Sequence, residues 1–368
     1  MHAAPLGALD RGQADISIHL DGSFKGLRHD WDRLALASNN VFATWEWHTT
    51  WWRHFGRGRL ILAACRREGQ VFAILPLYRA RRGPLRVLRF SGHGPADEVG
   101  PVCGPGDRVA AIMALRRVMA SIDGWDLFIG DALPADERWD ALLDGIEMHR
   151  EGSPVLVLDY ATWDDFTGRL TRKFRREIRS SDARASRVGR INYVRADSDL
   201  DLDIAFDIFE ALHDARWSGG RSSLTRYAAF HRDFSRIAAE RGWLRMWLLQ
   251  VDGSPAAIRY DFVFGDAYHA YNAGRDPGFS SLSPGLLLRA ATLRTAIEDG
   301  LRSYRFLRGS EPYKYRFPVV ASEIAVVAKA KGPIGRLAVS VARSLRRFER
   351  MRRLVRRLAS NVTSRQPA

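Results

Sequence analysis

Apolar runs and amphipathic stretches alternate along the chain in two similar series. In the first series, runs rich in β-branched and aromatic residues predict strands, and apolar positions three and four apart predict helices. The predicted strands are Ile16–Leu20, Leu60–Arg67, Val71–Tyr78, Leu85–Ser91 and Asp126–Ile129, and the predicted helices are Phe24–Ala37, Trp45–His54, Arg108–Ile122 and Ala135–His149. A further strand at Val155–Tyr160 is expected to close this half.

The second series repeats the same order of strand, two helices, three strands, helix and strand. Its predicted strands are Ile191–Arg195, Leu244–Val251, Pro255–Val263, Ala267–Ala273, Tyr304–Leu307 and Glu323–Ala330, and its predicted helices are Leu202–Trp217, Arg226–Arg241 and Leu286–Asp299. The basic segment Arg169–Arg195 is expected to connect the halves as a helix that turns near Gly189.

Two local matches indicate that the halves arose by duplication. The segments LILAACRREGQVFAILP, from Leu60, and LRMWLLQVDGSPAAIRY, from Leu244, both place a turn glycine nine residues after the first leucine. Pro105–Gly106 also lies 179 residues before Pro284–Gly285, and each pair stands at the start of a predicted helix.

Charge and composition narrow the class of protein. A length of 368 residues suggests two domains, and 46% hydrophobic residues can fill two cores. The net charge of +15 is concentrated at the end, since residues 329–368 hold twelve Lys or Arg and one Glu. Two cysteines exclude a disulfide scaffold and a cysteine-rich zinc site. No apolar run reaches membrane-spanning length, so we expect a cytoplasmic protein.

The basic end of the chain has the pattern of an amphipathic helix. Apolar residues recur at 334, 337, 341, 345, 348, 351, 355, 358 and 362, and arginines fill the opposite side. Such a helix can dock on the protein's own domains, lie on an anionic membrane surface or bind nucleic acid, and the sequence leaves these three interpretations open.

The segment Ser283–Gly285 opens a predicted helix in a way that suits anion binding. Ser is a preferred N-cap and Pro a preferred first helical residue. Gly285 leaves no Cβ beside the unpaired N–H groups of residues 285–287, and these donors with the helix dipole favour a phosphate or pyrophosphate. A well-capped helix without a ligand is the alternative interpretation.

The corresponding place in the first half has a different charge. There Gly104–Gly106 is followed by Asp107, where the second half has Leu286. A carboxylate at a helix start satisfies the dipole itself and repels a phosphate. If only one half binds an anionic cofactor, we therefore expect it to be the second.

Polar side chains follow the predicted strand Tyr304–Leu307, close to this helix start. Functional groups concentrate at such strand ends. Glu311 is a candidate general base and Tyr313 a candidate proton donor. Arg308 and Lys314 are candidate clamps for a phosphate or carboxylate. A solvated loop held by ion pairs is the alternative.

Two further loops hold candidate residues. Residues 212–223 contain two glycines and three serines, a composition that suits a loop able to close over a substrate. His213 and Trp217 in this segment share a helix face, and His213 is either catalytic or a structural histidine. The loop Ser91–Glu98 is either an acceptor-binding edge or a turn. The chain lacks the GxxxxGK[ST], GxGxxG, GxSxG and HExxH motifs, which argues against ATP hydrolysis, Rossmann redox chemistry, serine hydrolysis and zinc catalysis.

Taken together, several stretches resemble the CelD-like acyltransferases of the GNAT superfamily, a double-domain branch related to Fem-type peptidyl transferases. They are LHDARW (212–217), VDGSPAA (251–257), YNAGRDP (271–277), SPGLLL (283–288) and FLRGSEPYKYRF (306–317), with weaker likeness in FSGHGPADEVGP (90–101) and TWEWHTTWWRHF (44–55). The resemblance covers roughly residues 20–330. The usual GNAT signature, Arg/Gln-x-x-Gly-x-Gly/Ala, is absent around residues 283–288.

This resemblance implies an α+β fold of two tandem GNAT-like domains with mixed, mostly antiparallel sheets. Residues 1–160 would form a cofactor-free acceptor side, residues 161–330 the acyl-CoA domain, and residues 331–368 the basic helical tail. It also implies a metal-independent transferase that uses acetyl-CoA or another acyl-CoA. Its acceptor would be saccharide-linked, in exopolysaccharide, cellulose or cell-envelope synthesis.

We expect the active cleft to lie between the two halves. The candidate residues are Glu311, Tyr313 and His213 for catalysis; Asn272, Ala273, Gly274, Ser283, Gly285, Leu286 and Leu287 for the cofactor; and Arg216, Trp217, Arg308, Lys314 and Asp97 for the substrate. Two rival functions stay open: a Fem-like transferase that uses aminoacyl-tRNA, and a non-catalytic adaptor held at the membrane surface by its tail.

Overall fold

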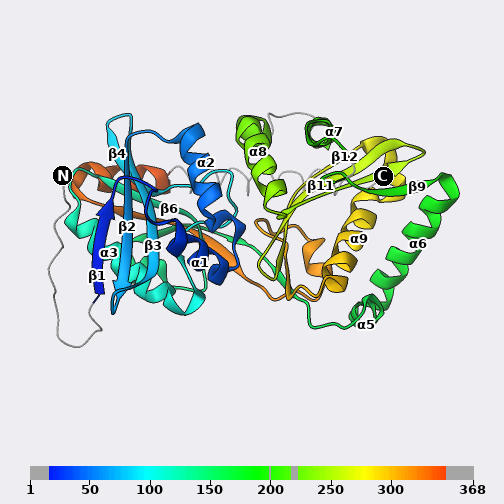
Figure 1. The fold of residues 1–368 in the computed structure, drawn as a ribbon, viewed down its shortest axis with the longest axis horizontal. Coiled ribbons are helices and arrows are strands. Elements are labelled where there is room, and N and C mark those ends of the chain that lie inside the picture. Colours follow the sequence, from blue (N-terminus) through cyan, green and yellow to red (C-terminus); the bar gives the residue numbers. More distant parts are fainter. Residues whose placement is uncertain (1–15, 199, 217–222, 345–368) are drawn as a thin grey trace, which may run out of the picture.

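Two mixed sheets, each flanked by helices, make up the computed structural model of the chain (Figure 1). The structure describes residues 16–198, 200–216 and 223–344. The first sheet contains β1 (Ile16–Asp21), β2 (Arg59–Arg67), β3 (Gln70–Arg82), β4 (Leu85–Phe90), β5 (Val102–Cys103), β6 (Leu127–Pro134), β7 (Ile146–Gly152) and β14 (Glu323–Ala330). The second sheet contains β8 (Val155–Val157), β9 (Ile191–Arg195), β10 (Leu244–Val251), β11 (Ser254–Phe264), β12 (Ala267–Arg275) and β13 (Ser303–Arg305).

Helices cover both sheets and follow the predicted order closely. They are α1 (Arg28–Ser38), α2 (Trp45–Phe55), α3 (Arg108–Ser121), α4 (Trp139–Leu143), α5 (Trp163–Arg169), α6 (Arg172–Val188), α7 (Leu202–Arg216), α8 (Ser223–Glu240) and α9 (Pro284–Glu298). Residues 332–344 are also helical. The expected α+β architecture with two mixed sheets is confirmed, and α6 is the expected basic connecting helix, ending at Gly189.

The two sheets have the same topology, which supports the predicted duplication. Strand order is β1-β2-β3-β4-β6 in the first sheet and β9-β10-β11-β12-β13 in the second. Within each of these five-strand series, the first three neighbouring pairs are antiparallel. The fourth pair is parallel: β4 with β6 in the first sheet and β12 with β13 in the second. The matched hairpins also share a turn: Glu68–Gly69 and Asp252–Gly253 all have positive φ, as a two-residue type I′ turn requires.

Each sheet is completed by a strand from the other half of the chain. β14 pairs antiparallel with β6 in the first sheet, and β8 pairs antiparallel with β13 in the second. The expectation that residues 155–160 close the first half is therefore wrong, as is the placement of residues 323–330 in the second. Composition could not show this exchange, because both strands are short apolar runs that fit either sheet edge.

The predicted helix Ala135–His149 is also wrong. Only α4 is helical there, and the chain turns at Asp144, which has φ of 51°, and continues as β7. β7 then pairs with β14 along its length. The alternation of apolar Ile146 and Met148 with polar neighbours suits a strand, and the arriving β14 supplies the pairing partner that a local pattern cannot reveal.

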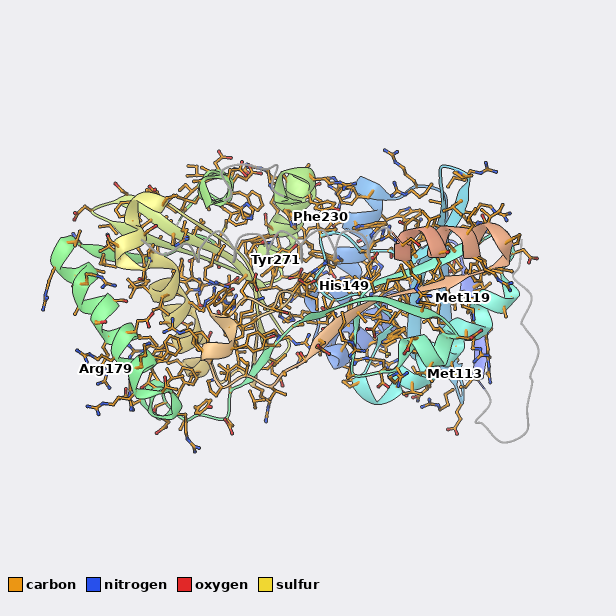
Figure 2. The ribbon with its side chains drawn as sticks, turned by 180° about the vertical axis from the view of Figure 1, so that it is seen from behind. Met113, Met119, His149, Arg179, Phe230 and Tyr271 are labelled. Atoms are coloured by element: carbon orange, nitrogen blue, oxygen red, sulfur yellow. The ribbon has the colours of Figure 1, made fainter. Side chains whose placement is uncertain are left out.

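The halves are joined by a shared apolar core. Trp47 of α2 packs its ring edge to face against Phe230 and Phe234 of α8, with centroid distances of 4.8 and 4.7 Å. The Tyr271 hydroxyl on β12 donates a hydrogen bond to the Pro95 carbonyl of the first half, and Figure 2 shows Tyr271 and Phe230 near the middle of the molecule. This packing fixes the loop around residue 95 against β12. Among the described helices, none has the length and apolar character to cross a bilayer.

Candidate active site in the second half

The site forms where two neighbouring strands of the second sheet separate. β12 pairs with β13 only over Ala267–His269, and beyond that point β12 continues beside β11 alone. A register shift between Tyr260 and Phe262 bends β11 at the same level. Residues 270–275 of β12 therefore have no strand partner on their β13 side, and a cleft of about 330 Å³ opens next to them.

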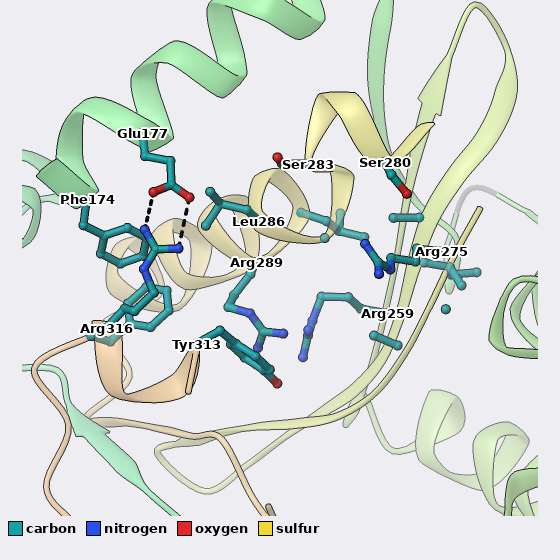
Figure 3. A pocket seen from close by; sticks show the side chains of 17 residues that line it. Phe174, Glu177, Arg259, Arg275, Ser280, Ser283, Leu286, Arg289, Tyr313 and Arg316 are labelled. Carbon is teal, nitrogen blue, oxygen red and sulfur yellow. Dashed lines mark hydrogen bonds and ion pairs between the residues drawn. The ribbon is translucent and has the colours of Figure 1, made fainter. Parts of the chain in front are cut away.

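The cleft is built entirely from the second half of the chain. It lies between β11, β12, α6, the start of α9 and the turn Lys314–Arg316, as Figure 3 shows. The lining residues are Phe174, Glu177, Ala257, Ile258, Arg259, Ala273, Gly274, Arg275, Ser280, Ser283, Gly285, Leu286, Leu288, Arg289, Tyr313, Arg316 and Phe317. No residue of the first half lines it in the described part of the chain, so the expected position between the halves is wrong for this cleft.

The start of α9 borders the cleft, but with fewer free donors than the sequence suggests. The N–H groups of Leu286 and Leu287 both donate to the Ser283 carbonyl, at 2.9 and 3.2 Å. Ser283 has a left-handed backbone (φ 56°), and its side chain makes no cap hydrogen bond. Of the three expected donors, only the Gly285 N–H lacks a partner among the described residues.

Gly285 leaves open space at this helix start. A Cβ placed there would meet no atom within 4 Å, and the residue has no positive φ. Neither packing nor backbone strain therefore requires glycine at this position. An open N–H at a helix start that borders a cleft is a suitable site for an anion.

Arg259 supplies a buried positive charge to the cleft. Its Nε and Nη2 donate to the two carboxylate oxygens of Asp261 at 2.5 and 2.9 Å, and both residues are buried. The same carboxylate accepts the Tyr271 N–H (2.8 Å) and the Tyr268 hydroxyl (3.1 Å). Burial lowers the pKa of Arg259, but the adjacent Asp261 charge more than offsets this and raises it, so the guanidinium stays charged.

Further arginines make the cleft positive. The Arg289 guanidinium carbon on α9 lies 4.4 Å from the centroid of the Tyr313 ring. Arg275, the last residue of β12, also lines the cleft. Figure 3 shows Arg259 and Arg289 pointing toward each other. Glu177 is the one acid in the lining and it pairs with Arg316, whose Nη1 lies 3.0 Å from a Glu177 oxygen. Because Asp261 neutralises one of the four arginines and Glu177 another, the cleft keeps an excess of positive charge.

Most of the expected cofactor residues come together here. Ala273, Gly274, Ser283, Gly285 and Leu286 line the cleft, with Tyr313 among the catalytic candidates. Gly274 has a packing reason of its own, since a Cβ there would lie 2.5 Å from the His213 backbone nitrogen on α7.

The remaining expected cofactor residues do not line this cleft. Leu287 is buried in the apolar core on the other side of α9. The side chain of Asn272 bonds the Tyr271 hydroxyl, so it serves the contact between the halves.

Lys314 and Glu311 have a structural role in the loop after β13. The Lys314 side chain is buried, and its Nζ donates to the carbonyl oxygens of Leu307, Arg308 and Gly309 at 2.7 to 3.2 Å. Lys314 Nζ also forms an ion pair with the exposed carboxylate of Glu311, at 3.0 Å from Oε2. The expectation that Lys314 clamps a substrate is therefore not supported, and Glu311 does not line the cleft.

His213 does not border the cleft either. It is buried on α7 against Phe209, with a centroid distance of 5.7 Å, as expected for a structural histidine. Arg216 ends α7, and Trp217 lies outside the described residues.

Asp97 and Arg308 meet on the contact between the halves. The Asp97 carboxylate accepts a hydrogen bond from the Arg308 backbone N–H, and burial raises the pKa of Asp97 to about 7 although the Arg308 and Lys314 charges lower it. The Arg308 side chain is paired with Glu151 at 2.8 Å. Asp97 lies in the segment between β4 and β5 of the first half, and a carboxyl group with a pKa near neutral pH at the contact between the halves is a candidate proton acceptor.

Sequence reasoning missed the arginines of the cleft. Arg259 stands within the apolar run AAIRYDF, and Arg289 within LLLRAAT. A charged residue in the middle of a buried strand or helix face is rare unless it is paired or functional. That signal was present in the sequence and could have identified both positions.

The comparisons with known proteins identify a domain family in the second half of the chain. Residues 172–315 match the family model of the Acetyltransferase (GNAT) domain, a range that covers almost the whole cleft lining. No curated protein matches the sequence. No group of three or more metal-ligating side chains occurs in the described residues.

Similar solved structures share the fold over most of the chain. FemX is 11% identical with a TM-score of 0.61, covering 83% of this chain and 96% of its own. The C-terminal domain of a putative lysylphosphatidylglycerol synthetase from Agrobacterium fabrum is 11% identical with a TM-score of 0.53, covering 85% and 95%. A conserved protein of unknown function from Bacteroides thetaiotaomicron VPI-5482 is 13% identical with a TM-score of 0.51, covering 85% and 100%. The family match and the shared fold together support an acyltransferase whose GNAT domain lies in the second half of the chain.

Proposed function

We propose that the protein transfers an acyl group from an acyl-CoA, with acetyl-CoA as the first choice, to a polar saccharide-linked acceptor. The observation that carries this proposal is the positive cleft beside the part of β12 that extends beyond its pairing with β13, with the open Gly285 N–H at its rim. A CoA donor has an anionic pyrophosphate and an extended pantetheine arm, and this site offers a matching partner for each.

The cleft residues divide the donor between them. The Gly285 N–H and the Arg275 guanidinium would bind the pyrophosphate, and the pantetheine arm would lie along the edge of β12 that extends beyond its pairing with β13. Arg259 and Arg289 add charge deeper in the cleft. Fixed donors of this kind act mainly by positioning the thioester for attack.

The acceptor is proposed to approach from the contact between the halves, where Asp97 and Arg308 lie. Its hydroxyl or amine attacks the thioester carbonyl, and the C–S bond breaks to release the CoA thiolate. Because Asp97 contacts the Arg308 backbone but does not line the cleft, the proton lost by the acceptor would reach the Asp97 carboxylate through a bridging water. Tyr313, at the cleft wall, is positioned to protonate the leaving thiolate. An exopolysaccharide or cell-envelope precursor is the acceptor class that the sequence resemblance suggests.

Calorimetric titration with acetyl-CoA tests the donor site. A Gly285→Asp variant places a carboxylate at the proposed pyrophosphate position, and we expect its affinity to fall about 100-fold. Gly106→Asp is the matched control, because Gly106 stands at the equivalent helix start and also has open space. Binding that is equal in both variants, or absent in the wild type, would overturn the proposal.

A second candidate donor, aminoacyl-tRNA, is favoured by the charge of α6. Six exposed cations lie on this helix beside the cleft: Arg172, Lys173, Arg176, Arg179, Arg184 and Arg187. Figure 2 shows Arg179 at the outer edge of the molecule. Such a row suits a nucleic-acid backbone. Tight, salt-sensitive binding of a tRNA acceptor stem that is lost in Arg176→Gln/Arg179→Gln, with no acetyl-CoA binding, would favour this donor.

A further inference from the structure

The helix over residues 332–344 contacts the rest of the protein through a narrow side. Val339 is buried against Leu127 and Ala328 of the first sheet. At Gly335 the helix comes so close to the Asp126 carbonyl that an added Cβ would overlap it. Glycine and a single valine therefore fix this helix on the first half, where Figure 2 shows it as the reddish helix along the surface.

The apolar stripe of this helix faces away from the protein. Ile334, Leu337 and Val341 are 53%, 66% and 49% exposed. They are spaced by three and four residues, so they lie on one helix face. The stripe that the sequence predicts is thus present, and in the described residues it is not what docks the helix on the domains.

The chain around this stripe is strongly basic. Arg336 and Arg343 are exposed, and they line a hollow of about 290 Å³ on the side of the helix that carries the docked Val339, away from the stripe. Beyond Arg343, the sequence adds eight arginines and one glutamate, and apolar positions recur at 345, 348, 351, 355 and 358. Exposed aliphatic groups followed by a strongly basic sequence match a surface of acyl chains and anionic headgroups.

We propose that the face formed by Ile334, Leu337 and Val341 binds the surface of an anionic lipid bilayer, with the arginines of the basic sequence that follows it supplying the charge. Aliphatic side chains would enter the headgroup region while arginines contact lipid phosphates. A second copy of the chain fits less well, because two such basic surfaces repel each other. Nucleic acid would use the arginines but would leave the aliphatic stripe in water. This inference does not depend on the proposed transferase activity.

Sedimentation with lipid vesicles tests the proposal on the full-length protein. We expect binding to vesicles that contain phosphatidylglycerol, little binding to pure phosphatidylcholine, and weaker binding at high salt. Leu337→Asp should lower the vesicle affinity about tenfold or more. Because Leu337 is 66% exposed, the fold should tolerate the change. Leu36→Asp, at a 58% exposed position on α1, is the matched control and should bind as the wild type does.

Each other outcome has a definite meaning. Wild-type protein that stays in solution with anionic vesicles at low salt overturns the proposal. So does vesicle binding that Leu337→Asp and Leu36→Asp lower equally. If ultracentrifugation shows a wild-type dimer that Leu337→Asp dissociates while vesicle binding is unchanged, the stripe is a self-association surface. Binding of duplex RNA that survives Leu337→Asp, without vesicle binding, would assign the basic segment to nucleic acid.

Discussion

The two halves share one topology but differ at the place where their central strands separate. In the second half this place is a cleft of about 330 Å³. Around the start of α3 in the first half, only about 20 Å³ remains, lined by residues that include Cys103, Arg108, Pro134 and Trp139. The same fold thus contains an open cleft at this place in one half and a closed core in the other.

Backbone and one large side chain close the first half. The Val99 N–H donates to the Ala132 carbonyl at 3.0 Å, so the segment after β4 covers the end of β6. Trp139 is 1% exposed and its indole N–H bonds the Pro134 carbonyl at 2.8 Å. No such covering segment follows β12, which instead stays paired with β11 as far as Arg275.

The charge at the helix start also differs between the halves, and it too favours an anion in the second half. Asp107 precedes α3 and is paired with Arg67 at 3.0 Å, so the charge at that start is already balanced. At α9 there is an open Gly285 N–H, and Arg289 follows one turn later. The first helix start therefore offers an anion no net attraction, whereas the second attracts it.

Trp139→Ala should have the largest effect, because it opens the closed site. Removing this buried indole should cost about 3–5 kcal/mol of unfolding free energy. Tyr313→Ala, on the wall of the open cleft, should cost about 1 kcal/mol, since Tyr313 is only half-buried. Urea denaturation of both variants measures the difference. Similar losses would show that the second-half cleft is as tightly packed as the first.

Arg289→Met should weaken donor binding by about 10- to 30-fold, or roughly 1.4–2 kcal/mol, because one positive charge of the cleft is lost. Folding stability should fall by only about 1 kcal/mol, since the Arg289 charge favours the ionised form of Asp261 and its guanidinium lies over the Tyr313 ring. Arg294→Met is the control on the exposed side of the same helix, where the arginine pairs with Glu298. Titration with acetyl-CoA compares them, and equal affinities would remove Arg289 from the site.

The sequence predicted local structure better than it predicted the joining of the halves. Alternation and helical spacing placed β10, β9 and β14 at their observed bounds, because each has a clear one-sided or buried pattern. It could not assign β14 and β8 to opposite sheets, since strand pairing depends on partners more than a hundred residues away.

The candidate site divides in the same way. Ser283–Leu286 could be found from helix-start chemistry, and it does border the cleft. Arg316 and Phe174 could not, because they reach the cleft only through the packing of α6 and the loop after β13. Lys314 was misjudged for a related reason: its backbone carbonyl partners form only when that loop folds.

Asp97→Asn tests whether a carboxyl group of the first half accepts the proton in the reaction proposed for the second half. The folded protein holds the Asp97 proton up to about pH 7, whereas the ordinary pKa is 3.8, so wild-type stability should fall as pH rises between these values. Asn carries no titrating proton, and the variant should be more stable than wild type by about 2 kcal/mol at pH 8 and similar at pH 4. Its turnover should drop about 100-fold. Thermal unfolding at a series of pH values measures the stability difference, and a pH–rate profile measures the turnover. A stability difference that does not change with pH would show that Asp97 does not titrate near neutral pH in the folded protein.

Ser283→Ala should have the smallest effect and sharpens the contrast between the helix starts. Because the Ser283 hydroxyl makes no cap hydrogen bond, its loss should change the free energy of unfolding by less than about 0.5 kcal/mol. Thr171→Ala is the control, since the Thr171 hydroxyl accepts the Phe174 N–H at 3.3 Å and caps α6, and its loss should cost about 1 kcal/mol. Denaturant titration of the two variants tests this. A cost at Ser283 equal to that at Thr171 would mean that α9 has an ordinary capped start, and the argument for an open anion site at Gly285 would lose its structural basis.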